Sequence, residues 1–205
     1  MSRRSQVPVR SARGRIGGLG LVVLGLAAAA APSALAQDVA ARLDTCAQCH
    51  GTDGNATLPN VPSLAAQPKV FLENQLVVIR EGLREIPAMK GVLDGVSDAE
   101  ISAIAVHYSA LPARSAAAGR DPATYDRGRQ LAESLRCGSC HLPDYRGREQ
   151  MPRLAGQRED YLFYTMRLLQ TNQATGRDTI MAASLYGIAE PDLRAMAHFL
   201  AHLGP

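Results

Sequence analysis

The chain has 205 residues, enough for one ordinary domain or two small ones, and its aromatic content is only 4%, with no tryptophan. So few aromatic side chains make a thin core for two domains, and small domains usually need a disulfide, a metal or a cofactor as well. The net charge of +3 comes from 22 basic and 19 acidic residues, but five of the basic residues lie before residue 37. The rest of the chain therefore carries 17 basic and 19 acidic residues, a net charge of −2, which argues against nucleic acid as a partner.

The first 36 residues have the pattern of a secretory signal peptide. Five arginines and no acidic residue accompany the apolar run 16–31, and Ala34-Leu35-Ala36 follows it. A basic region, a short apolar region and a small-x-small cleavage site occur in this order in signal peptides. We expect cleavage after Ala36 and export to the periplasm. The alternative is an uncleaved anchor, although the glycine-interrupted run is short for a membrane span.

The rest of the chain repeats itself at an offset of about 91 residues. Four blocks recur in the same order: 46–50 as 137–141, 61–67 as 151–157, Met89 as Met181, and 101–111 as 193–203. Nearly constant register over four blocks indicates duplication of one domain. We therefore expect a signal peptide at 1–36, domains at 37–112 and 122–205, and a linker at 113–121 containing Ala, Gly, Ser and Arg.

Both halves show helical patterns. Ser97-Asp98-Ala99-Glu100 has the form of a capping box, and Asp121-Pro122 forms a good N-cap and first turn. No stretch alternates convincingly as a strand would. The sequence predicts an all-α fold, with helices at about 69–84, 97–111, 121–136, 160–170 and 191–203.

The motif Cys-x-x-Cys-His occurs once in each half, as Cys46, Cys49, His50 and as Cys137, Cys140, His141. Cysteines three apart reach the two vinyl groups of one haem and form thioethers, and the adjacent histidine then becomes the proximal iron ligand. A thioredoxin-like pair would need a βαβ setting, and a shared zinc site would need the two halves to converge. Disulfides are the remaining alternative in an exported protein. Two motifs within a repeat favour two haem c groups.

A sixth iron ligand is expected from a methionine in each half. In the first half, Met89 lies in a proline-containing loop, whereas His107 lies within a helix and has Phe199 as its repeat counterpart. In the second half, Met181 alone matches Met89. We expect the other methionines there to be core residues; they are Met151, Met166 and Met196. Ligation by His50 and Met89, and by His141 and Met181, would raise the potentials and leave no open iron position, which favours electron transfer over catalysis.

Two prolines stand at matched positions after the haem motifs. Pro62 and Pro152 begin the repeated Pro-x-Leu-Ala-x-Gln blocks. A backbone carbonyl in this region could accept the Nδ1–H of the proximal histidine and fix its ring. A role of these prolines in shaping the loop is the alternative.

Together these residues resemble the class I cytochromes c and, in tandem, the di-haem cytochrome c4 family. The resemblance covers nearly all of the chain after the signal peptide, including the run His50-Gly51-x-Asp53-Gly54-Asn55. It implies two tandem class I domains, each wrapped around one covalent haem, with the haems close together across a domain interface and their propionates facing. The second motif departs from the pattern, because His141-Leu142-Pro143-Asp144 lacks the Gly-x-Asp-Gly-Asn run.

The resemblance also implies redox proteins as partners. The donor would be a quinol-oxidising complex or a dehydrogenase, and the acceptor a terminal oxidase or reductase, with peripheral association with a membrane left open. We expect a periplasmic electron carrier that is not an enzyme. The alternatives are a haem-bearing electron-transfer subunit of a dehydrogenase complex and a small haem enzyme or gas sensor, since the fold alone does not fix function.

Overall fold

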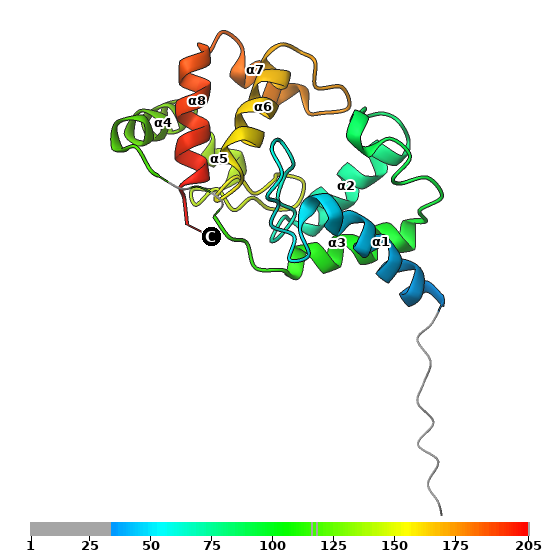
Figure 1. Ribbon diagram of the computed structural model, residues 1–205. Helices are drawn as coiled ribbons and strands as arrows, with labels where there is room; N and C mark the ends of the chain where they lie inside the picture. Colours follow the sequence, from blue (N-terminus) through cyan, green and yellow to red (C-terminus); the bar gives the residue numbers. More distant parts are fainter. Residues whose placement is uncertain (1–33, 116, 118, 205) are drawn as a thin grey trace, which may run out of the picture. The chain divides into compact units, whose positions relative to one another are not determined.

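The computed structural model describes residues 34–115, 117 and 119–204, and its regular elements are helices (Figure 1). The only β-type pairing among these residues is an isolated bridge between Arg148 and Met151. The predicted all-α class is thereby confirmed. The predicted signal peptide lies outside the described residues except for its last three positions. No helix in the described ranges is both long and apolar enough to cross a membrane.

The first half contains α1 (Ala34–His50), α2 (Lys69–Arg80), the short 3₁₀ helix η1 (Pro87–Met89) and α3 (Asp98–Ala110). α3 packs against both α1 and α2 and supplies the centre of the core with Ile101, Ile104, Ala105 and Tyr108. The predicted capping box is present, because the Ser97 hydroxyl accepts the Glu100 N–H and the Glu100 carboxylate accepts the Ser97 N–H. This box fixes the start of α3.

The second half contains α4 (Pro122–Ser134), α5 (Gly138–His141), α6 (Glu159–Gln170), α7 (Thr179–Leu185) and α8 (Glu190–Ala201). α8 is the central element and contacts α4 and α6 (Figure 1). Asp121 caps α4 by accepting the Thr124 N–H, as the sequence predicts. α4 and α8 cross closely at Gly128, where an added β-carbon would lie 2.0 Å from the Ala195 carbonyl oxygen.

The two halves lead into their haem motifs differently. α1 continues through Cys46 and Cys49 to His50, so the first motif is the end of a long helix. α4 ends at Ser134, and Arg136 then takes a left-handed conformation with φ of 56° before α5 carries the second motif. The predicted end at about residue 136 is therefore two residues late.

Buried apolar side chains form two separate clusters, one in each half. The partly buried residues packed against the first extend to Leu111, and those packed against the second begin at Ala117. Each half thus has its own core, which is the requirement for a domain. The boundaries at 37–112, 113–121 and 122–205 stay predictions.

Candidate functional site

The first motif places a buried histidine at the end of α1. The His50 ring is 9% exposed, and its Nδ1 lies 2.9 Å from the Pro62 carbonyl oxygen. A carbonyl can only accept, so Nδ1 carries the proton and Nε2 keeps its lone pair. Burial lowers the pKa of His50, which favours the neutral ring. A neutral imidazole with a free Nε2 is the form that ligates a metal.

The second motif repeats this arrangement. His141 is 3% exposed, and its Nδ1 lies 2.9 Å from the Pro152 carbonyl oxygen. Burial likewise lowers the pKa of His141. Its Nε2 is buried and has no hydrogen-bond partner among the described residues. Because buried polar atoms are nearly always paired, this nitrogen indicates a ligand position, and both expected carbonyl contacts are confirmed.

The four cysteines lie beside these histidines as free thiols. Cys46 and Cys137 are half-buried, and burial raises the pKa of each thiol; Cys49 and Cys140 are exposed. The one group of three metal-binding side chains found within the described ranges contains Glu159, His198 and His202, and no cysteine. Among the described residues, the cysteines form neither a disulfide nor a shared metal-binding group.

Each matched methionine packs against the core of its own half. Met89 ends η1 and is half-buried against the first core. Met181 is half-buried against the second core, but it lies within the helix α7, unlike its match Met89, which ends a short 3₁₀ helix. The difference arises because Asp178 accepts the Ile180 N–H and so starts a helix at Thr179.

The competing candidates have packing roles. Met166 and Met196 are buried in the second core, as expected. His107 is half-buried on α3, and its ring meets the Tyr108 ring edge-on with 5.1 Å between centroids. Met151 was also expected in the core, but it is half-buried at the bridge with Arg148 and lies outside the second core cluster.

Two arginines are buried, one in each half. Arg84 is 9% exposed and Arg153 is 6% exposed, and burial lowers the pKa of both. Neither forms an ion pair with any carboxylate in the described ranges, and Nη2 of Arg153 has no hydrogen-bond partner there. Buried charges are normally compensated. Haem carries two propionate carboxylates, so two buried arginines without an ion pair suit this cofactor, as does the unpartnered Nε2 of His141.

Comparison with known proteins agrees with this chemistry. Residues 30–107 match the family described as cytochrome C oxidase, cbb3-type, subunit III. The cytochrome c4 of Azotobacter vinelandii is 31% identical over 202 residues, covering 89% of this chain and 94% of that protein. The chain belongs to the cytochrome c4 family. It is accordingly a di-haem electron-transfer cytochrome, and its two Cys-x-x-Cys-His motifs fit two haem c groups.

Two further similarities extend the comparison. The crystal structure of reduced recombinant cytochrome c4 from Pseudomonas stutzeri matches with a TM-score of 0.74 at 27% identity, covering 82% of this chain and 98% of that chain. The thiosulfate dehydrogenase electron acceptor of Stutzerimonas stutzeri (strain A1501) is 29% identical over 170 residues, covering 78% of this chain and 79% of that protein. Cytochrome c4 proteins and an acceptor for a dehydrogenase are thus both similar to this chain.

In this cytochrome c4 family member, the turn after the second motif follows the backbone path of the turn after the first motif despite its different sequence. Leu142 has φ of 68°, close to the 83° of Gly51. Asp144 accepts the Arg146 N–H at 3.1 Å, as Asp53 accepts the Asn55 N–H at 3.0 Å. The missing Gly-x-Asp-Gly-Asn run therefore changes side chains but not the turn.

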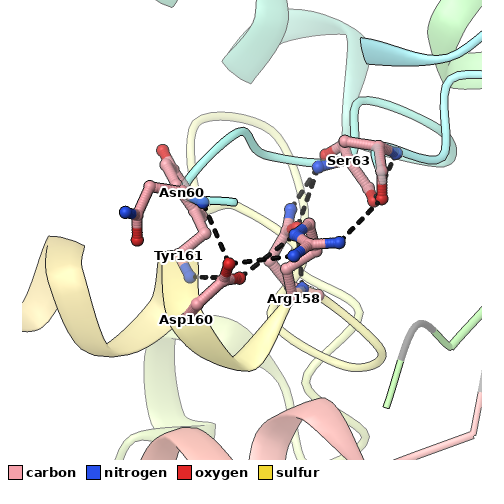
Figure 2. Close-up of polar contacts among 7 residues, drawn as sticks. Asn60, Ser63, Arg158, Asp160 and Tyr161 are labelled. Atoms are coloured by element: carbon pink, nitrogen blue, oxygen red, sulfur yellow. Dashed lines mark hydrogen bonds and ion pairs between the residues drawn. The ribbon is translucent and has the colours of Figure 1, made fainter. Parts of the chain in front are cut away.

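Polar contacts join the two halves of the cytochrome c4 fold beside these turns. Asp160 accepts the Asn60 backbone N–H at 2.9 Å and pairs with Arg158 at 2.8 Å (Figure 2). Nη1 of Arg158 also donates to the Ala56 carbonyl oxygen at 3.2 Å. These contacts place the segment after the first motif against the start of α6.

Two glutamines at this contact were missed as functional residues. Gln67 and Gln157 end the repeated Pro-x-Leu-Ala-x-Gln blocks, and each is 5% exposed. Each side-chain amide bonds to the backbone of the other half, at Arg153 and Ser63 respectively. The only sequence signal was their repetition, which by itself indicates duplication and not contact.

Proposed function

We propose that Cys46 and Cys49 hold the first haem as thioethers, with His50 and Met89 as its axial ligands. Cys137 and Cys140 hold the second haem in the same way, with His141 and Met181 as axial ligands. In each half the motif histidine is buried and neutral, with Nδ1 fixed by a proline carbonyl and Nε2 left for the iron. That repeated arrangement is the observation that carries the proposal.

The methionine assignment rests on matched positions and partial burial. A methionine thioether opposite a histidine favours reduced iron and raises the potential. If His50 and Met89, and His141 and Met181, hold the two irons, no iron site would be left for a substrate or for dioxygen. The protein then transfers single electrons and performs no catalysis at the haem.

Replacement of the two methionines tests the ligand assignment. Met89→Ala and Met181→Ala should each remove about half of the weak far-red absorption band of methionine-ligated ferric haem. The double variant should lose the band, whereas Met151→Ala should keep it. A full band in the double variant would contradict the assignment.

We infer that the working protein is periplasmic and begins at Gln37. The signal-peptide pattern of residues 1–36 supports export, and the acidic balance of the remaining chain suits neither nucleic acid nor tight membrane binding. Its donor is a quinol-oxidising complex or a dehydrogenase, and its acceptor is a terminal oxidase or reductase. N-terminal sequencing of the secreted protein should give Gln37-Asp38-Val39, and a start within the apolar run would contradict cleavage.

A second candidate is a haem-bearing electron-transfer partner of a periplasmic dehydrogenase. The similarity to the thiosulfate dehydrogenase electron acceptor of Stutzerimonas stutzeri favours it. Purification of the protein from native membrane and soluble fractions distinguishes these two candidate functions. A dehydrogenase that co-purifies in fixed stoichiometry would support the subunit, and a free monomer that exchanges electrons with several proteins would support the shuttle.

A further inference from the structure

The amides of Gln67 and Gln157 form two equivalent pairs of hydrogen bonds between the halves. Gln67 Nε2 donates to the Arg153 carbonyl oxygen at 2.9 Å, and Gln67 Oε1 accepts the Arg153 N–H at 3.0 Å. Gln157 Nε2 donates to the Ser63 carbonyl oxygen at 2.8 Å, and Gln157 Oε1 accepts the Ser63 N–H at 2.9 Å. The two pairs of hydrogen bonds are reciprocal. Gln67 matches Gln157 and Ser63 matches Arg153 at the same offset of 90 residues, so each half supplies the same two positions.

Each glutamine contacts the same peptide group that holds a haem-motif histidine. The Ser63 N–H and the Pro62 carbonyl belong to one planar peptide, and that carbonyl accepts His50 Nδ1–H. The Arg153 N–H and the Pro152 carbonyl likewise belong to one peptide, which accepts His141 Nδ1–H. A continuous path therefore runs from Gln157 to His50, and another from Gln67 to His141.

The residues on both hydrogen-bond paths are buried, so water does not compete for these hydrogen bonds. Ser63 and Arg153 are each 6% exposed, and both glutamines are 5% exposed. Hydrogen bonds on the two sides of a peptide group polarise each other, and the effect is larger in a medium of low dielectric constant. An acceptor on the N–H side makes the carbonyl oxygen on the other side more negative, so it binds the histidine N–H more strongly.

We propose that each glutamine tunes the reduction potential of the haem in the opposite half. Gln157 acts on the haem held by His50, and Gln67 acts on the haem held by His141; the inference rests on the axial ligands proposed above. A stronger Nδ1–H···O bond gives the imidazole more anionic character and stabilises ferric iron. Each glutamine therefore lowers the reduction potential of the haem in the opposite half. Separation of the two halves would remove both effects and raise the reduction potentials of both haems.

Crossed substitutions test this in the intact di-haem protein. Gln67→Met and Gln157→Met remove the amide at similar side-chain length, and each variant is the matched control for the other. Redox titration would follow resolved paramagnetic NMR signals of each haem, so that every potential is assigned to one half. We expect Gln157→Met to raise only the first potential and Gln67→Met only the second. The reduced-to-oxidised ratio should rise roughly two- to fourfold, or about 18 to 36 mV at 59 mV per tenfold.

A second measurement keeps the test decisive. The Nδ1–H proton resonance of His50 in the reduced protein should move upfield in Gln157→Met and stay in place in Gln67→Met, with the reverse for His141. If a Met variant fails to fold with both haems, the corresponding Gln→Asn variant, one methylene shorter, replaces it. The Asn variant must also shift only the potential of the haem in the opposite half. A shift in the same half, equal shifts in both halves or no shift overturns the proposal while the ligands stand. If the unmodified protein shows no NMR signals of iron-bound His50 and His141, the ligand assignment itself is overturned.

Discussion

The Tyr108 ring fills the space beside Gly54, because a β-carbon on Gly54 would lie 2.9 Å from Tyr108 Cδ1. Gly54 has φ of 72°, and its carbonyl accepts the N–H groups of Leu64 and Ala65. In the second half Tyr145 occupies the equivalent position, and its carbonyl accepts the N–H groups of Leu154 and Ala155. The aromatic ring thus comes from α3 in one half and from the turn in the other.

Gly54→Ala should destabilise the first domain. The new methyl group would be too close to the Tyr108 ring and also 3.1 Å from the Ala65 nitrogen, and the backbone would hold alanine at a positive φ. Overpacking and left-handed strain together should lower the free energy of unfolding by about 2–4 kcal/mol. Denaturant unfolding of the haem-loaded protein measures this, and an unchanged midpoint would contradict the packing described.

Gly128→Ala should destabilise the second domain more strongly. A β-carbon there would lie 2.0 Å from the Ala195 carbonyl oxygen and 2.8 Å from Phe199 Cβ, so α4 and α8 would have to separate. We expect a loss of about 3 kcal/mol or more in thermal unfolding. Gly204→Ala is the control, because no atom lies within 4 Å of its added carbon. Equal midpoints for the two variants would show that the helices do not cross as closely as described.

Leu142→Gly should preserve or increase stability. Leu142 combines φ of 68° with ψ of 157°, a conformation that glycine adopts readily and other residues adopt at a cost of about 1–3 kcal/mol. Relief of this strain offsets the loss of a half-buried side chain and the greater freedom of glycine in the unfolded chain, so we expect stability to be kept or raised by up to about 1 kcal/mol. Leu154→Gly, at another half-buried leucine of the same domain, should lower stability. A loss of similar size in both variants would refute the strain.

Glu100 should make the first domain sensitive to acid. Hydrogen bonds from the Ser97 hydroxyl and the Ser97 backbone N–H lower the pKa of Glu100. The unfolded state therefore binds this proton first as pH falls below about 4.3, so stability present at neutral pH is lost on acidification. Glu100→Gln should melt earlier than the unmodified protein at pH 7, and the difference should close in acid. Glu85→Gln, at an exposed site, should show no such convergence.

The sequence predicted the elements whose signals are local. The capping box at Ser97, the N-cap at Asp121 and the motif histidines all follow from residues within a few positions of one another. The α7 helix around Met181 was missed because a seven-residue helix started by Asp178 offers too little periodicity to detect. The similarity of the turn after His141 to the turn after His50 was not predicted. Leu142 and Tyr145 take positive φ values there, and sequence patterns assign such values to glycine.

Contacts between the halves lay beyond sequence reasoning. Gln67 and Gln157 were visible as repeated residues, but their partners lie 86 and 94 positions away. Such pairing depends on how two folded domains meet, and neither periodicity nor motif spacing encodes that. The burial of Arg84 and Arg153 could not be predicted either. Arginine is usually exposed, and nothing in the neighbouring sequence marks these two residues as buried.

The central claim is that each half holds its own covalent haem, and the intact mass of the purified exported protein tests it most directly. We expect the mass of residues 37–205 plus two haems, with loss of one haem in Cys46→Ala/Cys49→Ala and of the other in Cys137→Ala/Cys140→Ala. A haem-free mass, or one shifted only by lost thiol protons or a bound metal ion, would contradict it.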